Sequence, residues 1–233
     1  MKNSMKRILA VAFLVGAGAG VFAQTESDFT VYTDKHGFVT ITSYTGNGTN
    51  LVIPGVIGGA RVDKIGRGVF AGRPGIQSVV LPDSIRDLGE GAFQGCTGLQ
   101  SVTLPAGLEE IDDRVFMNCT SLKAISLPSR VRKIEKEAFR GCTALQSITF
   151  PASLEDIDER AFADCSALKA AVLPEGLREI GRGAFYGCIS LSSCGLPGGL
   201  RKVERGAFQG CVSLDDPSRE AITRRFGSRA IFG

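Results

Sequence analysis

The feature that most constrains this chain is a repeat of 23 residues that runs from Ala60 to Leu214. A fixed period between 20 and 50 residues is typical of a solenoid, in which every unit stacks on its neighbours because it cannot bury its own apolar side chains. The repeat therefore predicts columns of identical residues along one shared core. Three residue types keep this step: Phe70, Phe93, Phe116, Phe139, Phe162, Phe185 and Phe208; Cys96, Cys119, Cys142, Cys165, Cys188 and Cys211; and Pro82, Pro105, Pro128, Pro151, Pro174 and Pro197.

One period reads LxxVxLPxxLxxIxxxAFxxCxx. Its first part, Leu99 to Leu104, ends in the apolar alternation of a half-buried strand. Leu108 and Ile111 begin a second extended or turn segment, and the pair Gly95–Cys96, with its equivalents, closes the coil. Each coil is therefore predicted to contain two short extended segments and a tight return.

The signature LPxxLxxIxxxAFxxC resembles the BspA-like, Treponema-type class of leucine-rich repeats from about Leu51 to Leu214. The resemblance implies an α/β leucine-rich repeat solenoid of mainly short parallel β-strands with short helical turns. For function it implies a surface or secreted adhesin that contacts host extracellular-matrix proteins, host cells or other bacteria. The motif residues are core residues, so the resemblance identifies no binding residue.

Residues 1–23 are predicted to be a secretory signal peptide. Lys2, Lys6 and Arg7 precede an apolar run from Ile8 to Val21, and a small residue, Ala23, ends the segment. The alternative is a transmembrane anchor, but the run is shorter than the roughly 18 to 20 apolar residues that a membrane span requires. The mature chain is expected to begin at Gln24 and to be exported, to the cell surface, the medium or the periplasm.

The mature chain is predicted to be electrically neutral. The full sequence has 27 Lys and Arg against 24 Asp and Glu, and removing the three basic residues of the leader leaves 24 of each. A neutral protein lacks the net positive charge that nucleic acids and anionic membrane surfaces attract. Neither is therefore expected as a partner.

One domain is predicted over residues 24–233. Residues 24–59 form a strand-rich N-terminal cap, 60–214 about seven repeats, and 215–233 a helical C-terminal cap. The first repeat is expected to carry a five-residue insertion near Gly58. In the C-terminal cap, Asp216 is expected to be the helix N-cap, with Ile222 and Phe226 on the face that covers the core.

The regular cysteines are predicted to be a column of buried free thiols. Neighbouring side chains at one repeat position point the same way, which does not suit a disulfide, and no convergent ligands suggest zinc. Cys194 stands at a strand position and is expected to point into the core. A bridge between Cys194 and Cys188 is the alternative at that one place.

No catalytic, cofactor-binding or metal-binding residue is predicted. His36, the single histidine, has no marked nucleophile beside it. The acidic pairs Glu109–Glu110 and Glu155–Asp156 recur about 10 Å apart, near the upper limit for an inverting glycosidase. Basic pairs such as Arg132–Lys133 lie between them, so an exposed ladder of opposite charges one repeat apart is favoured over a hydrolase.

The predicted binding surface is the outward face of the LxxLxL strands. Its side chains are small, uncharged and mostly hydroxylated, which suits a flat platform for a protein partner. Ordinary β-propensity on a solvated sheet is the competing interpretation. We predict a non-enzymatic, protein-binding adhesin without cofactors; a periplasmic scaffold for envelope partners is the alternative, and a hydrolase is less favoured. The candidate binding residues are Ser78, Ser101, Thr103, Ser126, Ser147, Thr149 and Ser193.

Overall fold

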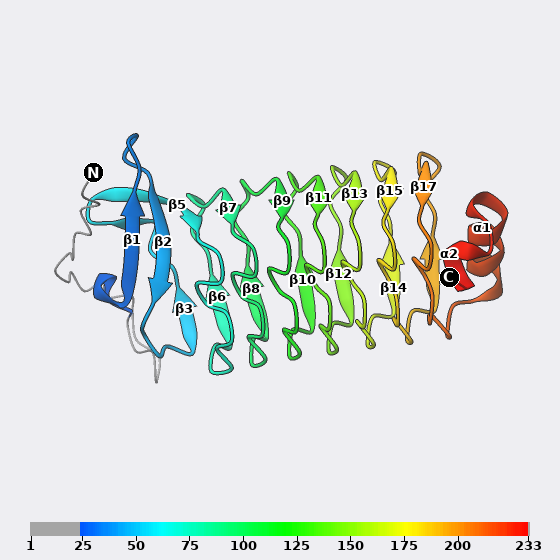
Figure 1. Ribbon diagram of the computed structural model, residues 1–233, viewed down its shortest axis with the longest axis horizontal. Helices are drawn as coiled ribbons and strands as arrows, with labels where there is room; N and C mark the ends of the chain where they lie inside the picture. The colour runs from blue at the N-terminus through cyan, green and yellow to red at the C-terminus, as the bar shows by residue number, and fades with distance from the viewer. Residues whose placement is uncertain (1–23, 233) are drawn as a thin grey trace.

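The computed structural model describes residues 24–232 as a straight stack of coils. The predicted signal peptide, residues 1–23, lies outside the described part of the chain. Successive coils lie side by side along the long axis, with an antiparallel strand pair at the N-terminal end and helices at the other (Figure 1). The leucine-rich repeat solenoid expected from the sequence is confirmed.

Each repeat contributes one three-residue strand and one two-residue strand. The three-residue strands are β6 (Ser78–Val80), β8 (Ser101–Thr103), β10 (Ala124–Ser126), β12 (Ser147–Thr149), β14 (Ala170–Val172) and β16 (Ser193–Gly195). The two-residue strands are β7 (Asp87–Leu88), β9 (Glu110–Ile111), β11 (Lys133–Ile134), β13 (Asp156–Ile157), β15 (Glu179–Ile180) and β17 (Lys202–Val203).

Equivalent strands pair in parallel with a shift of one repeat. The two-residue strands form a continuous ladder from β9 to β17. The three-residue strands form three shorter ladders, β3-β6-β8, β10-β12 and β14-β16. The ladder stops after β8 and after β12, where the inward Val102 and Ile148 are half-buried, whereas their equivalents in the other strands are buried.

The return path of each coil is a run of turns with hydrogen bonds from residue i+3 to residue i. In one coil the amides of Ala92, Gln94 and Cys96 donate to the carbonyls three residues earlier. These runs are the short helical turns expected from the repeat. Within the described residues no helix is assigned between β1 and α1.

Two positions of each return path have a positive φ. The first column is Gly68, Gly91, Arg114, Glu137, Arg160, Gly183 and Gly206, and the second is Gly72, Gly95, Asn118, Gly141, Asp164, Gly187 and Gly210. Glycine adopts this left-handed conformation without strain, whereas a side chain costs roughly 1 to 2 kcal/mol there. In the first column the strain is therefore confined to the three central coils.

We expect Arg160→Gly to raise the free energy of unfolding by up to about 1 kcal/mol, because it removes left-handed strain. Arg160 has φ 53° and an exposed side chain with no ion pair among the described residues. Glu137→Gly is the matched comparison. It relieves similar strain but removes ion pairs to Arg114 at 2.9 Å and Arg140 at 2.6 Å. In urea unfolding experiments, the free energy of unfolding should be higher for Arg160→Gly than for Glu137→Gly. The reverse order would contradict the strain argument.

The core is an aromatic column flanked by aliphatic side chains. All seven repeat phenylalanines are completely buried. Their rings stack nearly parallel, with centroids 5.0 to 5.7 Å apart and interplanar angles of 2° to 17°. Tyr44 and Phe29 extend the column into the N-terminal cap, with centroid separations of 5.3 and 5.1 Å.

The cysteines form a second buried column, and all seven are free thiols. The bridge between Cys188 and Cys194 is not present. Each repeat thiol donates a hydrogen bond to the Phe carbonyl of the preceding coil; the Cys142 Sγ, for example, lies 3.1 Å from the Phe116 oxygen. The thiol thus fills the space of a small apolar side chain and also satisfies a buried acceptor.

The N-terminal cap continues the stack and ends it with an antiparallel strand. It comprises η1 (Glu26–Asp28), β1 (Phe29–Thr33), β2 (Val39–Tyr44), β3 (Asn50–Val52) and β4 (Val56–Ile57), and it is followed by β5 (Ala60–Ile65) of the first repeat. β2 pairs in parallel with β5, and β1 pairs antiparallel on the outside of β2. The insertion is the β4–β5 hairpin, whose turn at Gly58 and Gly59 has φ of 60° and 78°.

The C-terminal cap consists of α1 (Asp216–Phe226) and α2 (Arg229–Phe232). The expected N-cap was wrong by one residue: Asp215 is the N-cap, because its carboxylate accepts the Ser218 amide at 2.9 Å. Ile222 is completely buried against the last coil. The Ser218 hydroxyl accepts the Cys194 amide at 3.1 Å, so the helix also covers part of the edge of β16.

Candidate functional site

The outward face of the three-residue strands contains every candidate binding residue predicted from the sequence. The first outward column is Ser78, Ser101, Ala124, Ser147, Ala170 and Ser193, and the second is Val80, Thr103, Ser126, Thr149, Val172 and Gly195. All are exposed except Ser78, which is half-buried. The strand periodicity was therefore sufficient to place these side chains on one surface.

The face contains one more strand than predicted from the sequence. β3 pairs in register with β6 and adds Asn50 to the first column and Val52 to the second. The step from Leu51 to Val79 is 28 residues, which is the repeat length plus the five-residue insertion. Subtracting the insertion from this step restores the 23-residue period and identifies β3 as the first strand of the platform.

Six hydroxyl groups on this face are free to bind a partner. Within residues 24–232, no side-chain hydrogen bond is made by Ser101, Thr103, Ser126, Ser147, Thr149 or Ser193. Ser78 differs, because its hydroxyl donates to Asn50 Oδ1 at 2.7 Å. Side chains as short as serine and threonine lose little entropy when a partner orders them. The face therefore offers donors and acceptors at low ordering cost.

Two exposed valines make the N-terminal end of this face more apolar than its middle. Val52 and Val80 are 56% and 42% exposed and lie opposite each other in the β3–β6 pair. Val172, 80% exposed, stands in the same column near the other end. The platform thus combines hydroxyl groups with isolated apolar contacts and has no charged side chain in either column.

The charged ladder beside the two-residue strands is only partly as predicted. Opposite charges do meet one repeat apart in Lys64–Asp87, at 2.8 Å, and in Arg132–Glu155, also at 2.8 Å. Lys133, however, pairs most closely with Glu135 of its own coil, at 2.8 Å, and lies 3.9 Å from Asp158, which follows the neighbouring strand β13.

Two further members of the ladder depart from the expectation. Asp156 lies beside another carboxylate, Glu179, in the strand register. Arg178 donates to backbone carbonyls. Long side chains reach several partners, so the register alone did not fix these pairs.

The acidic pairs lie on an open strand surface. Glu110, Lys133 and Asp156 occupy three consecutive strands, so the lysine stands between the two carboxylates. Partial burial raises the pKa of Glu110, and neighbouring carboxylates add to this effect. Burial also raises the pKa of Asp156, whereas Lys133 opposes that rise. A raised carboxyl pKa favours a general acid only inside a site that binds substrate, whereas Glu109, Glu110 and Glu155 are exposed on the strand surface.

Neither a metal-binding cluster nor a membrane-spanning helix is found in the described part of the chain. Residues 24–232 contain no group of three His, Cys, Asp or Glu side chains that could hold a metal ion. His36 lies in the β1–β2 turn, where its amide donates to the Asp34 carboxylate at 2.8 Å. None of the helices in this part of the chain is long and apolar enough to cross a bilayer.

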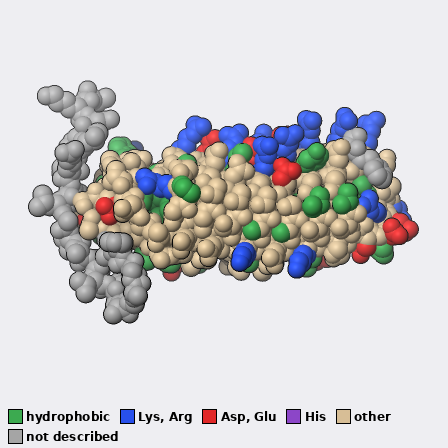
Figure 2. Space-filling view, turned by 90° about the horizontal axis from the view of Figure 1, so that it is seen from below, with side chains coloured by type: hydrophobic (Ala, Val, Ile, Leu, Met, Phe, Trp, Pro, Cys, Tyr) green, Lys and Arg blue, Asp and Glu red, His purple; other side chains and the backbone are tan. Residues whose placement is uncertain are grey.

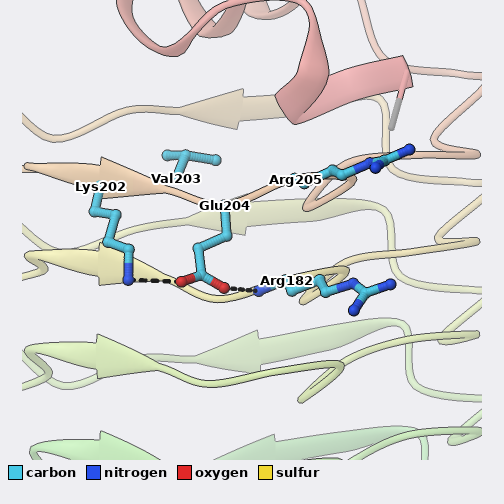
Figure 3. A pocket seen from close by; sticks show the side chains of 5 residues that line it. All are labelled: Arg182, Lys202, Val203, Glu204 and Arg205. Carbon is cyan, nitrogen blue, oxygen red and sulfur yellow. Dashed lines mark hydrogen bonds and ion pairs between the residues drawn. The ribbon is translucent and has the colours of Figure 1, made fainter.

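A shallow hollow of about 400 Å³ lies near the C-terminal end of the solenoid, beside β17. Glu204 lies between Lys202, whose Nζ is 2.6 Å from its carboxylate, and the Arg182 amide, which donates at 3.0 Å (Figure 3). The side chains of Arg182 and Arg205 point away from Glu204, both toward the same side. The hollow is therefore lined mainly by polar and basic side chains.

Comparisons with known proteins agree with this architecture. The sequence profile of the BspA type leucine rich repeat region matches in six copies, over residues 63–170 and 157–231. The crystal structure of a Treponema pallidum leucine-rich repeat protein is similar, with a TM-score of 0.83 and 32% identity over 88% of this chain and 97% of that one.

A second solved structure is more distant. A leucine-rich repeat protein from Bacteroides ovatus has a TM-score of 0.61 and 26% identity over 78% of this chain and 55% of its own. No curated protein matches the sequence significantly. With its fold, its aromatic and thiol columns and these matches, the chain belongs to the BspA-type leucine-rich repeat family.

Proposed function

We propose that this protein is exported and binds other proteins through the outward serine and threonine face, acting as an adhesin toward host or bacterial surface proteins. Membership of a leucine-rich repeat family supports protein binding as the general role. Export rests on the leader predicted at residues 1–23. The proposed role is non-enzymatic, because the conspicuous surface of the chain is an open platform.

The observation that carries this proposal is the row of free hydroxyl groups on the strand face. The core of each coil requires the inward residues, whereas nothing inside the molecule uses the six outward hydroxyls of the described strands. A partner that lies across several coils would meet them at the regular strand spacing of about 4.8 Å. Shape and hydroxyl hydrogen bonds would then dominate, so binding should depend weakly on salt.

The first test is to capture partners with the mature protein from host matrix proteins and, separately, from bacterial envelope extract. A retained partner is then assayed against the double variant Thr103→Arg with Thr149→Arg. These substitutions place two long charged side chains in the middle of the face. We expect at least a tenfold loss of affinity, because each would have to be desolvated or displaced on binding.

Two controls separate the face from general charge effects. The variant Thr97→Arg with Thr143→Arg adds the same charge at exposed turn positions and should retain binding. Replacing Arg132 and Lys133 by alanine tests the charged ladder. If the ladder variant abolishes binding while the folded face variant keeps it, the wrong surface has been proposed. Capture of envelope partners alone would favour the periplasmic scaffold over the adhesin.

A further inference from the structure

A row of four arginines runs along the turn edge of the C-terminal coils. Backbone hydrogen bonds join the turns that contain them. The Arg160 amide donates to the Arg182 oxygen at 3.0 Å, and the amides of Gly183 and Gly206, which follow Arg182 and Arg205, donate to the oxygens of Arg205 at 3.3 Å and Arg229 at 2.8 Å. The row therefore crosses four adjacent layers of the solenoid, about 5 Å apart. All four side chains are exposed.

The row is not neutralised by the protein itself. Among residues 24–232, none of the four guanidinium groups forms an ion pair. Glu204, the acidic side chain that lines the hollow, is paired with Lys202 and with a backbone amide. Figure 3 shows the side chains of Arg182 and Arg205 extending together beyond it. Four like charges at neighbouring positions repel each other, which disfavours the folded state unless a counter-charge binds.

The same edge is electrically mixed in the preceding coils. Arg67 pairs with Glu90 at 3.2 Å, Glu90 with Arg114 at 2.8 Å, and Arg114 with Glu137 at 2.9 Å. Stacking does not therefore require one sign at this edge. From Arg160 onward an arginine stands at this edge in each coil, although Glu159 precedes Arg160 at the repeat position that Arg182 occupies in the next coil.

The charge of the whole chain follows the same division. Residues 24–175 contain 15 basic and 19 acidic side chains, whereas residues 176–232 contain nine basic and five acidic ones. The neutral total therefore conceals a positive C-terminal end. In the view of Figure 2, Lys and Arg side chains gather along one long edge of the solenoid, while few charges lie in the middle.

The surface beside the row includes the shallow hollow near β17, whose lining contains Arg182 and Arg205. Gly183, which follows Arg182 in sequence, is buried, and an added Cβ there would be in ordinary contact with Arg160 Cγ at 3.4 Å and Tyr186 Cβ at 3.6 Å. Tyr186 is 45% exposed and places one aromatic side chain near Arg160. A ligand that reaches these guanidinium groups therefore has to lie on an open surface.

We propose that this row, Arg160, Arg182, Arg205 and Arg229, is a binding site for a sulfated polysaccharide chain. Guanidinium groups bind oxyanions through paired N–H donors, and regular spacing across four layers matches a linear polyanion better than a single small anion. Single-stranded nucleic acid is less suited, because sites for it stack successive bases on several aromatic side chains. This site lies outside the strand face and is independent of the proposed protein-binding role.

The test uses a heparin-derived oligosaccharide of defined length as probe, with the same chain after chemical desulfation, a single-stranded oligonucleotide of equal charge and anionic phospholipid vesicles as comparisons. We expect the mature protein to bind the sulfated chain and to lose at least tenfold in affinity for the desulfated one. The logarithm of the affinity should fall steeply with the logarithm of salt concentration.

The decisive variant is Arg182→Gln with Arg205→Gln, for which we expect at least a tenfold loss of affinity and a shallower salt dependence. Lys35→Gln with Arg130→Gln removes two positive charges from exposed positions outside the row, which form no ion pair among the described residues, and should bind almost normally. Circular dichroism checks that both remain folded, and Arg182→Lys with Arg205→Lys should recover part of the affinity. The proposal is overturned by no binding of the sulfated chain, by equal losses in the two Gln variants, or by tighter binding of the oligonucleotide or vesicles.

Discussion

Replacing Phe139 by alanine is expected to lower the free energy of unfolding by roughly 3 to 5 kcal/mol, the usual cost of a large cavity in a core. Phe139 is completely buried in a central coil. Its ring stacks on Phe116 and Phe162 with centroids 5.4 and 5.2 Å away. Because a solenoid is stabilised by contacts between adjacent units, loss of this ring weakens the interfaces on both sides.

Denaturant unfolding followed by circular dichroism measures this loss. Phe38→Ala is the matched control, since Phe38 is 41% exposed in the N-terminal cap and should change stability by under about 0.5 kcal/mol. Phe139→Leu keeps most of the apolar volume and should cost less than the alanine variant. A loss under 1 kcal/mol for Phe139→Ala would refute the role of the aromatic column.

Stability is expected to fall steeply above about pH 9, because thiols that ionise in the unfolded chain stay protonated in the folded one. Burial raises the pKa of Cys142 to about 12 and that of Cys96 to about 11. At a pH between the thiol pKa of the unfolded chain and that of the folded chain, the unfolded state binds fewer protons than the folded state. Raising the pH in this range therefore favours the unfolded state and lowers the free energy of unfolding. Each such thiol contributes a slope of about 1.4 kcal/mol per pH unit.

Unfolding free energies measured between pH 8 and pH 11 test this linkage. The variant Cys142→Ala should be less stable at pH 8, because its cavity and the lost hydrogen bond to Phe116 are costly, yet its stability should fall less steeply with pH. Below about pH 8 the thiols are protonated in both states, so they should no longer contribute to the pH dependence of the free energy of unfolding. An unchanged alkaline slope in Cys142→Ala would show that this thiol does not contribute.

The sequence alone determined the repeat, the columns and the outward face. A period of 23 residues with strand alternation leaves few ways to bury Phe, Leu and Cys, so stacking and side-chain direction follow together. The insertion near Gly58 and the apolar face of the C-terminal helix were likewise predictable from the repeat spacing and the helical spacing, whereas the β4–β5 hairpin formed by the insertion emerged only from the structure. The helix N-cap was off by one position, because Asp215 and Asp216 are both suitable and only the backbone conformation distinguishes them.

The tertiary structure decided what depends on contacts between neighbouring coils when the residues involved occupy different repeat positions, as Arg160 and Arg182 do. The four arginines are separated by steps of 22, 23 and 24 residues, so no fixed period reveals the row; backbone pairing across the coils does. The thiol of each coil reaches the Phe carbonyl of the preceding coil, 26 residues earlier, a distance set by stacking. Lys133 pairs most closely with Glu135, although several carboxylates lie within its reach. The strand register does not determine this choice, because a flexible side chain adopts the conformation that its local surroundings favour.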